Sequence, residues 1–389
     1  MYYPTLREDL TSIKLFVGID VDDTAFHGYA IASDENEGVE FKTRPSASSL
    51  IKTLKKIRRA EHQMRVCYEA GYLGYSLQRE LKKHGILCEV IAPTLIPKPA
   101  GKTVKTDRID ARSLAIYYKK GLLIPVHIPT QTQEALRDLL RSRHFVKKQT
   151  VRIRHHLLSH TRRMGLHYRQ ETNNPDGAYW TKKHLSWLNT RMGHKYAPGI
   201  EIKLSLLLKR LESLNNEADT YDDEIRKISQ ASEYKDSIQA LVCYRGINVL
   251  SAATLVTEIG DIRRFAHPRY LTSYCGMDIR EYSSGGKEKK FHMSRFGNRY
   301  IRTTVVEACQ CVASAPLISQ SLKQRRQNAP KEFIDIADRC MQRLHKKARH
   351  LLYKSKPKNK VKAACARELL GFIWESLMLA SKVPPIYKT

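Results

Sequence analysis

Two aspartates three positions apart, Asp107 and Asp110, stand at the start of a stretch with helical apolar spacing. On a helix, both carboxylates would project from one face. Acids are common in a first helical turn because they favour the positive end of the helix dipole, so the pair alone is weak evidence for chemistry. Asp20 and Glu69 strengthen it, because each lies in or at the end of a short apolar strand, where a carboxylate is costly to bury. These four acids could converge into one divalent-metal site.

Four such carboxylates suit two-metal phosphoryl chemistry, in which hard cations about 4 Å apart stabilise the attacking and leaving oxygens. The expected cofactor is Mg²⁺ or Mn²⁺. Asp22 and Asp23 follow the first strand directly and are expected to be solvated. A sugar-kinase or actin-like fold also opens with a strand that ends in Asp. That fold, however, needs glycine two residues after the Asp so that the backbone can approach phosphate. This chain has Asp22 there, beside Asp23, and the two acids would repel phosphate.

A small polar turn far along the chain, Ser283-Ser284-Gly285-Gly286, is a second candidate. By itself such a turn is typical of a β-hairpin tip. A serine can attack phosphorus only when a base, a metal ion or neighbouring cations activate it. The only histidine close to the turn in sequence is His292, so the residues alone leave a structural role open.

Four histidines, His155, His156, His160 and His167, lie on or just after a basic helical stretch. His156 and His160 are four apart and could share one metal ion. A zinc-protease helix needs glutamate directly after the first histidine, where this chain has Leu157. That motif is absent, and the histidines are expected to face phosphate or solvent.

Alternating strands and helices in the first 120 residues would position the four acids. The strands that precede Asp20 and Glu69 are almost wholly apolar, which is typical of strands buried on both faces. Strands are expected at 15–21, 27–31, 38–42, 64–69 and 87–91, and helices at 46–59, around 73–81 and from 107 onward. This order predicts an α/β layer fold.

Long helical patterns follow at 130–164 and 200–229, separated by an interrupted stretch at 168–200. Arg and Lys alternate with the apolar positions of the first pattern. Two long helices joined by a loop suggest a helical arm or a coiled-coil pair. Such a pair serves dimerisation or clamps nucleic acid, and both roles stay open.

The C-terminal part is expected to be mainly helical. Two helices should meet at a tight turn around Gly246, an arrangement that can offer backbone amides to phosphate. A polar β-hairpin at 280–291 and a helix at about 300–315 should follow. Alternating lysines at 354–362 surround Pro357 and predict a flexible, polyanion-binding loop.

Charge is distributed unevenly along the 389 residues, which are too many for one ordinary core. The net charge is +29, of which residues 1–120 contribute +5 and the remainder +24. A near-neutral first part joined to a strongly basic remainder suggests that the remainder binds a polyanion such as nucleic acid.

Cysteine usage and hydropathy indicate the compartment. None of the eight cysteines forms a CxxC pair, and most lie in apolar stretches, which fits buried free thiols in a reducing environment. The sequence has no signal peptide and no apolar stretch near 18 residues. A cytoplasmic protein is therefore expected, and the motif resemblance described below implies a nucleoid-associated protein of a bacterium or archaeon.

In this order, the motifs resemble those of the Piv-type insertion-sequence transposases, the DEDD recombinases whose relatives are guided by a bridge RNA. The resemblance spans roughly residues 13–380. Its acidic motifs are Gly18-Ile19-Asp20, Cys67-Tyr68-Glu69-Ala70-Gly71 and Lys105-Thr106-Asp107-Arg108-Ile109-Asp110-Ala111. Its C-terminal motifs are Arg245-Gly246-Ile247, Gly260-Asp261-Ile262 with Phe265, Ser283-Ser284-Gly285 and Ser294-Arg295-Phe296-Gly297-Asn298.

This resemblance implies an α/β plus α architecture. Residues 1–128 would form a RuvC-like domain of RNase H fold, 129–235 a helical coiled-coil arm, and 236–389 a C-terminal transposase domain with a helix-hairpin-helix-like segment. It also implies a serine nucleophile that links covalently to DNA, completed by metal-binding acids. The implied partners are target and donor DNA, a noncoding guide (bridge) RNA, and further copies that form dimers pairing into a tetramer.

Two motifs depart from the family pattern. The usual Pro-Gly-Ile-Gly hairpin is Arg245-Gly246-Ile247-Asn248 here, and the usual Ser-Lys box has Arg295. Both replacements suit phosphate contact. The nucleophile is Ser283 if counted back from the Ser294 box, or Ser284 if it must directly precede glycine.

Two other functions stay open. A metal-dependent, structure-selective nuclease of the Holliday-junction type would use the acids, with the serine turn structural, and would form no covalent adduct with DNA. A nonenzymatic nucleic-acid scaffold would need no metal, so Asp107→Asn would leave every activity unchanged.

Overall fold

The computed structural model describes residues 13–58, 63–97, 106–192, 198–284, 287–294 and 296–382, and of residues 192, 198, 280–284 and 287–291 the backbone alone. The chain separates into two compact units, Met1–Pro129 and Thr130–Thr389. The helical arm and the C-terminal helices belong to the same unit. The division into three domains stays a prediction.

A five-stranded mixed sheet forms the centre of the first unit, in the order β3-β2-β1-β4-β5. The strands are β1 (Lys14–Val21), β2 (Phe26–Ala32), β3 (Val39–Thr43), β4 (Gln63–Glu69) and β5 (Leu87–Ile91). The first three form an antiparallel meander, whereas β4 and β5 run parallel to β1. Parallel neighbours need crossover connections, which α1 (Ala47–Ile57) and α2 (Ser76–Lys83) supply. The expected strands are confirmed.

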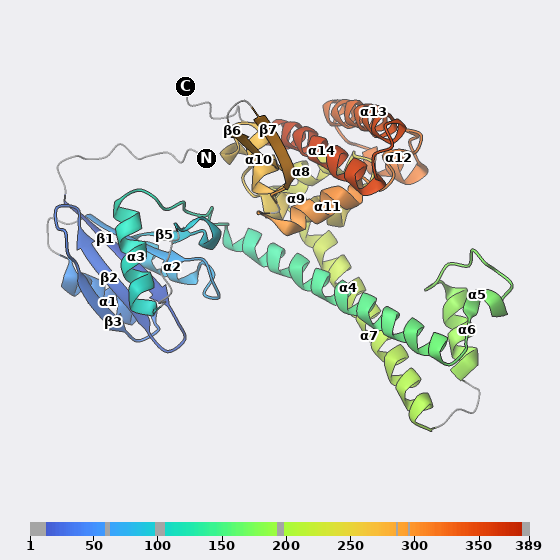
Figure 1. The fold of residues 1–389 in the computed structure, drawn as a ribbon, viewed down its shortest axis with the longest axis horizontal. Helices are drawn as coiled ribbons and strands as arrows, with labels where there is room; N and C mark the ends of the chain where they lie inside the picture. Colours follow the sequence, from blue (N-terminus) through green and yellow to red (C-terminus); the bar gives the residue numbers. More distant parts are fainter. Residues whose placement is uncertain are drawn as a thin grey trace. The chain divides into compact units, whose positions relative to one another are not determined.

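Helices cover both faces of this sheet (Figure 1). Because successive side chains of a strand point to opposite faces, Leu15, Val17 and Ile19 of β1 pack in one core cluster with α1 and α2. Phe16 packs on the other face with α3 (Asp107–Lys119). The short 3-10 helix η1 (Pro93–Leu95) follows β5.

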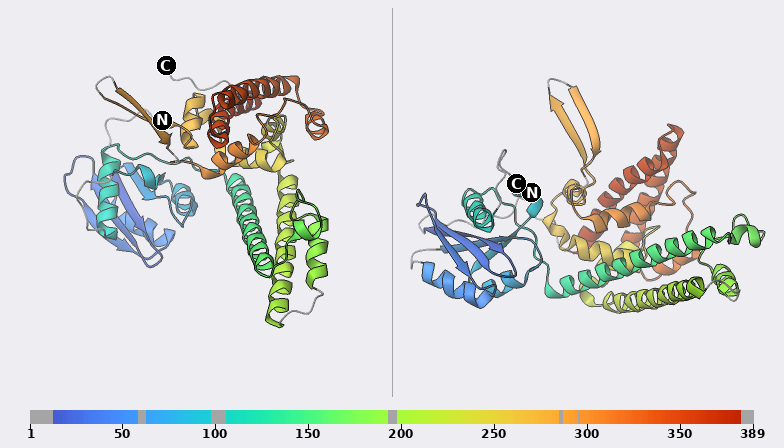
Figure 2. Two further views of the ribbon diagram at one scale, coloured as in Figure 1. Left: turned by 45° about the vertical axis from the view of Figure 1, so that its right-hand side comes forward. Right: turned by 60° about the horizontal axis from the view of Figure 1, so that its bottom comes forward.

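The second unit begins with two long helices, α4 (Gln131–Arg163) and α7 (Pro198–Ile228), which lie side by side (Figures 1 and 2). The Thr130 side chain caps α4 by accepting a hydrogen bond from the amide of Gln133. Apolar side chains of the two helices meet in clusters around Leu214 and Leu157. The expected pair of long helices is confirmed.

The sequence predicts a loop between these helices, but the connection is not a simple loop. It contains α5 (Tyr168–Glu171) and α6 (Lys182–Met192). Both are held by aromatic packing around His184, whose ring lies 4.7 Å from that of Tyr168 and 5.7 Å from that of Trp187. Packing of this kind leaves no periodic pattern in the sequence.

The rest of the second unit is mainly helical, with one two-stranded hairpin. Its elements are α8 (Ser232–Val242), α9 (Val249–Ile259), η2 (Ile262–Arg264), α10 (Pro268–Tyr274), β6 (Ile279–Ser284), β7 (Lys287–Met293), α11 (Arg299–Ala308), α12 (Gln320–Arg326), α13 (Lys331–Tyr353) and α14 (Lys358–Ala380). Apart from α12, these helices share one large core with the first turns of α4. The expected helical turn at Gly246 and the hairpin are confirmed.

Gly246 is required between α8 and α9. Its φ of +86° is a conformation that side-chain-bearing residues rarely adopt. A Cβ atom there would also lie 2.3 Å from the carbonyl oxygen of Ala308. The turn therefore packs directly on the end of α11.

Helix α11 ends at Ala308, earlier than the expected end near Ala315. Beyond it the amides of Cys309 and Gln310 bond to carbonyls three residues back, so the helix tightens into turns. Pro316 then disfavours helical backbone in the residue before it.

The lysine-rich stretch at 354–362 is a loop only at 354–357, between α13 and α14, and the expected loop is wrong for its second half. Helix α14 begins at Lys358, directly after Pro357, which is the N-cap residue. The apolar side chains of Val361 and Cys365 are buried in the core of the unit, so packing of that face extends the helix through the lysines.

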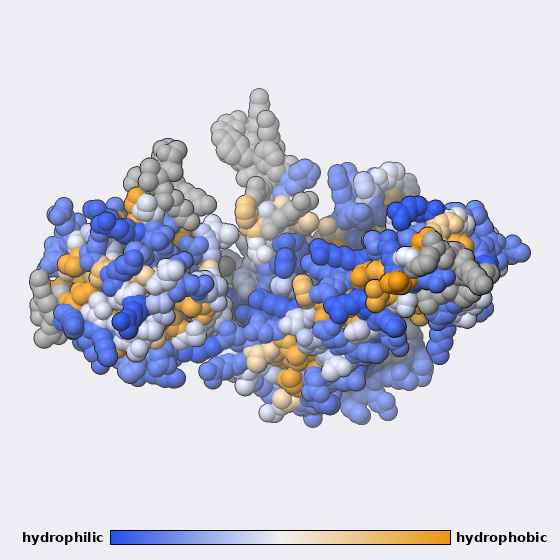
Figure 3. Space-filling model, turned by 90° about the horizontal axis from the view of Figure 1, so that it is seen from below, coloured by the Kyte–Doolittle hydropathy of each residue, from blue (hydrophilic) through white to orange (hydrophobic). Residues whose placement is uncertain are grey.

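All eight cysteines are free and all but Cys311 are buried, as expected. Among the described residues, no helix combines the length and the hydropathy needed to cross a bilayer. Hydrophilic residues dominate the face drawn in Figure 3, where hydrophobic residues form only small separate patches.

Candidate functional site

Asp20 and Glu69 lie at neighbouring strand ends. β1 and β4 pair in parallel with Ile19 opposite Tyr68, so each acid is the next residue along its strand. Asp20 is partly buried and Glu69 is exposed. Parallel strands carry their C-terminal ends to the same edge of a sheet, which brings the two acids together.

Both acids are on the face that α3 covers. Two residues earlier in each strand, Gly18 and Cys67 pack against this helix. A Cβ atom on Gly18 would lie 2.4 Å from the carbonyl oxygen of Ala111, so strand and helix backbones are in direct contact. Because the side-chain period of a strand is two, the acids share this face.

The first turn of α3 supplies the other two acids. The Thr106 side chain caps the helix by accepting a hydrogen bond from the backbone three residues on. Asp107 and Asp110 therefore lie at its positive end. A carboxylate oxygen of Asp107 is 4.0 Å from Nε2 of His27, which is the cross-strand neighbour of Asp20.

The four acids thus gather at one edge of the sheet, beside the start of α3. Carboxylate oxygens are the donors that hard divalent cations prefer, so the residue types fit Mg²⁺ or Mn²⁺. Among the described residues, however, no three Asp, Glu, His or Cys side chains are close enough to ligate one ion. The carboxylates are neighbours at an accessible edge and not a closed coordination sphere.

Asp22 and Asp23 are exposed in the turn after β1, as expected. The hydroxyl of Thr24 donates a hydrogen bond of 2.7 Å to Asp22. This bond, together with one from the Thr24 amide, lowers the pKa of Asp22.

The two candidate serines end strand β6. In the hairpin ladder Ser283 pairs with Glu288 and Ser284 with Lys287. Gly285, Gly286 and Arg295 lie outside the described residues, as do the serine side chains. The hairpin projects from the helices of its unit (Figure 2), so both serines lie at its distal end.

The histidine prediction is wrong in part. His155 and His156 are exposed, but His160 is buried. Its Nδ1 is 3.1 Å from Arg163 and 3.3 Å from Lys203 of α7. The ring therefore packs between the arm helices, and burial together with these cations lowers its pKa.

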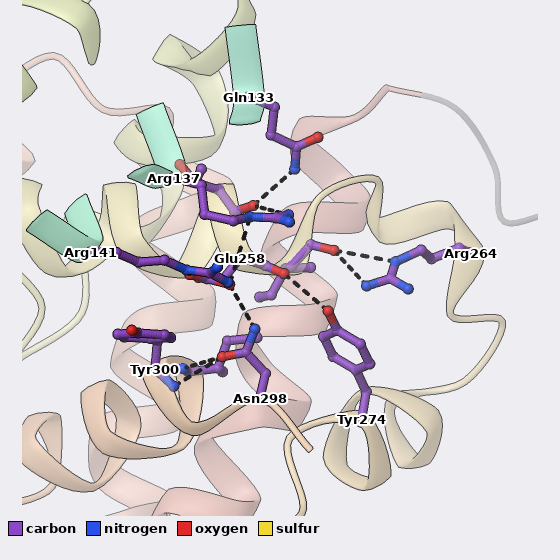
Figure 4. Close-up of polar contacts among 11 residues, drawn as sticks. Gln133, Arg137, Arg141, Glu258, Arg264, Tyr274, Asn298 and Tyr300 are labelled. Atoms are coloured by element: carbon purple, nitrogen blue, oxygen red, sulfur yellow. Dashed lines mark hydrogen bonds and ion pairs between the residues drawn. The ribbon is translucent and has the colours of Figure 1, made fainter. Parts of the chain in front are cut away.

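A buried charge cluster that the sequence analysis missed surrounds Glu258, near the end of α9 (Figure 4). The Glu258 side chain is 1% exposed. Arg141 binds it with two hydrogen bonds, of 2.8 and 3.0 Å. Nε of Arg137 is 3.7 Å from the same carboxylate, and Nδ2 of Asn298 donates a hydrogen bond of 2.7 Å. A single charged residue in an otherwise uncharged helix was the available signal.

A polar cavity of about 190 Å³ adjoins this cluster between α4, α9 and α11. Its lining includes Arg141, His144, Ser251, Tyr300 and Glu307. The guanidinium of Arg141 lies 5.0 Å from the centre of the Tyr300 ring. The lining combines cations with carboxylates, so charge alone does not indicate an anion as its ligand.

Two family models match the chain. One, described as the transposase IS116/IS110/IS902 family, matches residues 239–324, which include Glu258, both serines and Asn298. The other, a transposase model of the IS110 DEDD type, matches residues 17–164, which include the four acids.

Curated relatives match over most of their length. A putative transposase of Sinorhizobium fredii, y4qE, is 31% identical over 364 residues, which cover 93% of this chain and 88% of the relative. The transposase for insertion sequence element IS1533 of Leptospira borgpetersenii is 27% identical, covering 88% of this chain and 98% of the relative. The transposase for IS1111A of Coxiella burnetii is 23% identical, covering 79% of each.

Proposed function

The chain belongs to the IS116/IS110/IS902 family of insertion-sequence transposases, and we propose that it cuts and rejoins DNA with two sets of residues, four acids and a serine. It is a transposase, an enzyme of DNA transposition and recombination. The observation that carries the proposed chemistry is the gathering of Asp20, Glu69, Asp107 and Asp110 at one sheet edge.

In this proposal the four acids hold Mg²⁺ or Mn²⁺. The bound cations would stabilise negative charge on the phosphate and on the leaving oxygen. The acids themselves would hold the ions at this edge of the sheet, and the start of α3 adds the positive end of its dipole. The mixed sheet with helices on both faces supports an RNase H-like, RuvC-like fold for this unit.

The proposed nucleophile is the hydroxyl of Ser283 or Ser284. Its oxygen forms a bond to a DNA phosphorus, and the bond from that phosphorus to one bridging deoxyribose oxygen breaks. The serine proton ends on the strand that leaves as a hydroxyl. Attack by a different strand end reverses the step and rejoins DNA. The distal position of both serines on β6 supports access to a large substrate.

Nucleic acids and further copies of the chain are the proposed partners. The net charge of +29 supports binding of target and donor DNA and of a noncoding bridge RNA. The arm formed by α4 and α7 supports assembly into dimers and a tetramer. We place the protein in the cytoplasm, at the nucleoid, where its DNA substrates are.

Trapping of a covalent protein–DNA adduct tests the serine. The substrate is a nicked donor whose cut strand end diffuses away, so that rejoining is prevented. The wild type should accumulate an adduct with Mg²⁺ and should form none when a chelator is present from the start. Alanine at the serine that attacks, Ser283 or Ser284, should abolish the adduct, whereas alanine at the other serine should leave an adduct whose DNA-linked residue identifies the nucleophile. Exposed Ser273 gives the matched control, since Ser273→Ala should retain the wild-type yield.

Asp107→Asn tests the acids in the same assay, and it should abolish both cleavage and adduct. If the double change of both serines leaves strand joining intact, the serine assignment is wrong. Cleavage that needs the acids but never passes through an adduct would identify a metal-dependent junction nuclease instead.

A further inference from the structure

We propose that Glu258 is a positioning residue that fixes the base of the β6–β7 hairpin to the arm helix α4. The inference rests on the proposed catalytic serine for its functional meaning. Its structural basis lies entirely within the second unit, among residues that Figure 4 draws together.

The chain segments on both sides of the hairpin form hydrogen bonds with Glu258. On the incoming side, the hydroxyl of Tyr274 donates a hydrogen bond of 3.4 Å to the main-chain carbonyl of Glu258, shortly before β6 begins at Ile279. On the outgoing side, Asn298 binds the Glu258 carboxylate, five residues after β7 ends at Met293. One residue therefore contacts both segments that enter and leave the hairpin.

The orientation of Asn298 is fixed from several directions. Its side-chain oxygen accepts hydrogen bonds from the amides of Tyr300 and Ile301 and so caps α11. The side-chain NH₂ group consequently points to Glu258. The main-chain N–H of Asn298 donates a hydrogen bond of 2.9 Å to the carbonyl of Tyr274, and this bond joins the two segments directly.

Two further contacts close the hairpin base. The amide of Ser294 donates to the carbonyl of Asp278, and the Ser294 hydroxyl binds the Asp278 carboxylate. Gly297 has φ +140°, and a Cβ atom there would lie 2.3 Å from the carbonyl oxygen of Tyr274. The crossing of the two segments is therefore tight enough to require glycine.

A stripe of side chains on α4 holds the other side of the cluster. Gln133, Arg137 and Arg141 recur at four-residue steps and so share one face of the helix. Gln133 and Arg137 donate hydrogen bonds of 2.9 and 3.0 Å to the carbonyl of Thr257. Arg141 binds the carboxylate of Glu258. The arm helix thus contacts Glu258, which anchors the hairpin, and the residue before it, Thr257.

The test is glutamine at position 258. Glu258→Gln keeps the shape but removes the charge, and its NH₂ group cannot accept a hydrogen bond from Arg141 or Asn298. Hydrogen exchange of the amides in 274–298 should accelerate at least about tenfold, the factor expected when a charge-assisted hydrogen bond is lost. Adduct formation at saturating DNA should slow by a similar factor, while DNA affinity stays within about twofold.

Asp338→Asn is the matched control. It breaks another ion pair of the unit, between α12 and α13, in which Nη2 of Arg326 is 2.7 Å from Asp338. The control should lower the melting temperature without changing exchange in 274–298. Arg141→Lys keeps the charge but not the paired hydrogen bonds, so it should give an intermediate increase in the exchange rate of 274–298. This variant replaces Glu258→Gln in the test if the glutamine variant fails to fold.

Equal exchange in 274–298 for the glutamine variant and the wild type would overturn the inference, as would an equal increase in the Asp338→Asn control. Hydrogen exchange does not depend on which group attacks DNA. A failure of the serine assignment would therefore leave this result interpretable.

Discussion

His184 shows how much a single buried residue contributes to the arm. Its side chain is fully buried among Tyr168, Tyr179, Trp180 and Trp187. Nδ1 accepts a hydrogen bond from the amide of Trp180, at 3.1 Å. Burial lowers the pKa of His184 from its usual 6.5 to about 4, because a charged imidazolium would lose its hydration.

The consequence is a pH-dependent stability of the connection between α4 and α7, which contains α5 and α6. Between pH 6.5 and 4 the unfolded state binds more protons at this site than the folded state, so stability is complete above this window and falls as the pH is lowered through it. Below both pKa values, the loss in the free energy of unfolding should reach on the order of 3 kcal/mol.

Tryptophan fluorescence measures this transition, because Trp180 and Trp187 contact His184. A Trp374→Phe background removes the tryptophan outside the arm. The emission should change between pH 6.5 and 4, and His184→Phe, which keeps an aromatic ring without a titratable group, should abolish the change. An unaltered pH profile in that variant would contradict the assignment.

The packing of α3 on β1 is the element-scale feature on which the acids depend. Gly18 allows the two backbones to touch, since any side chain there would meet the backbone of Ala111 and Ala115 at 2.4 Å. A larger residue would displace the helix whose first turn carries Asp107 and Asp110.

Gly18→Ala should therefore destabilise the first unit by about 1–3 kcal/mol, the usual cost of overpacking. It should also weaken Mn²⁺ binding, measured by titration calorimetry. Gly371→Ala is the matched control, because its added Cβ in helix α14 would have no atom within 4 Å other than its chain neighbours and the backbone of its own helix. That control should stabilise its helix by up to about 1 kcal/mol. Equal effects of the two variants would refute the role assigned to Gly18.

Local signals explain which elements could be predicted from the sequence. The strands of the first unit have apolar runs bounded by turns, and α3 and α4 begin at threonines that cap them. Side-chain alternation, which is a local rule, places Asp20 and Glu69 on one face, whereas the pairing of β1 with β4 that brings them together is long-range.

Long-range packing explains what could not be predicted. Glu258 is 117 residues from Arg141 and 40 from Asn298, so no window of sequence contains the cluster. His160 looked solvated because its neighbours on α4 are basic, yet α7 covers it. The lysines before Val361 resembled a loop because the core that extends α14 comes from distant helices.

At the scale of the whole molecule, the two units have separate cores. The buried clusters of the first unit contain only residues before Pro129, and the large cluster of the second contains only residues after it. Units with independent cores are expected to unfold independently.

Calorimetry of the full chain should therefore resolve two transitions. Leu54→Ala, which removes a fully buried side chain of the first unit, should lower the midpoint temperature of one transition. Leu255→Ala, equally buried in the second unit, should lower that of the other. A single transition shifted by both variants would show that the units unfold together.

The hairpin fastened at Glu258 has a mechanical consequence. A β-strand rises about 3.3 Å per residue, so six residues of β6 carry the serine end roughly 20 Å from the anchored end. Any angular error at the anchored end is magnified in proportion to that length. Under the proposed serine chemistry, the accuracy with which the hydroxyl meets a phosphate therefore depends on the Glu258 carboxylate at the anchored end.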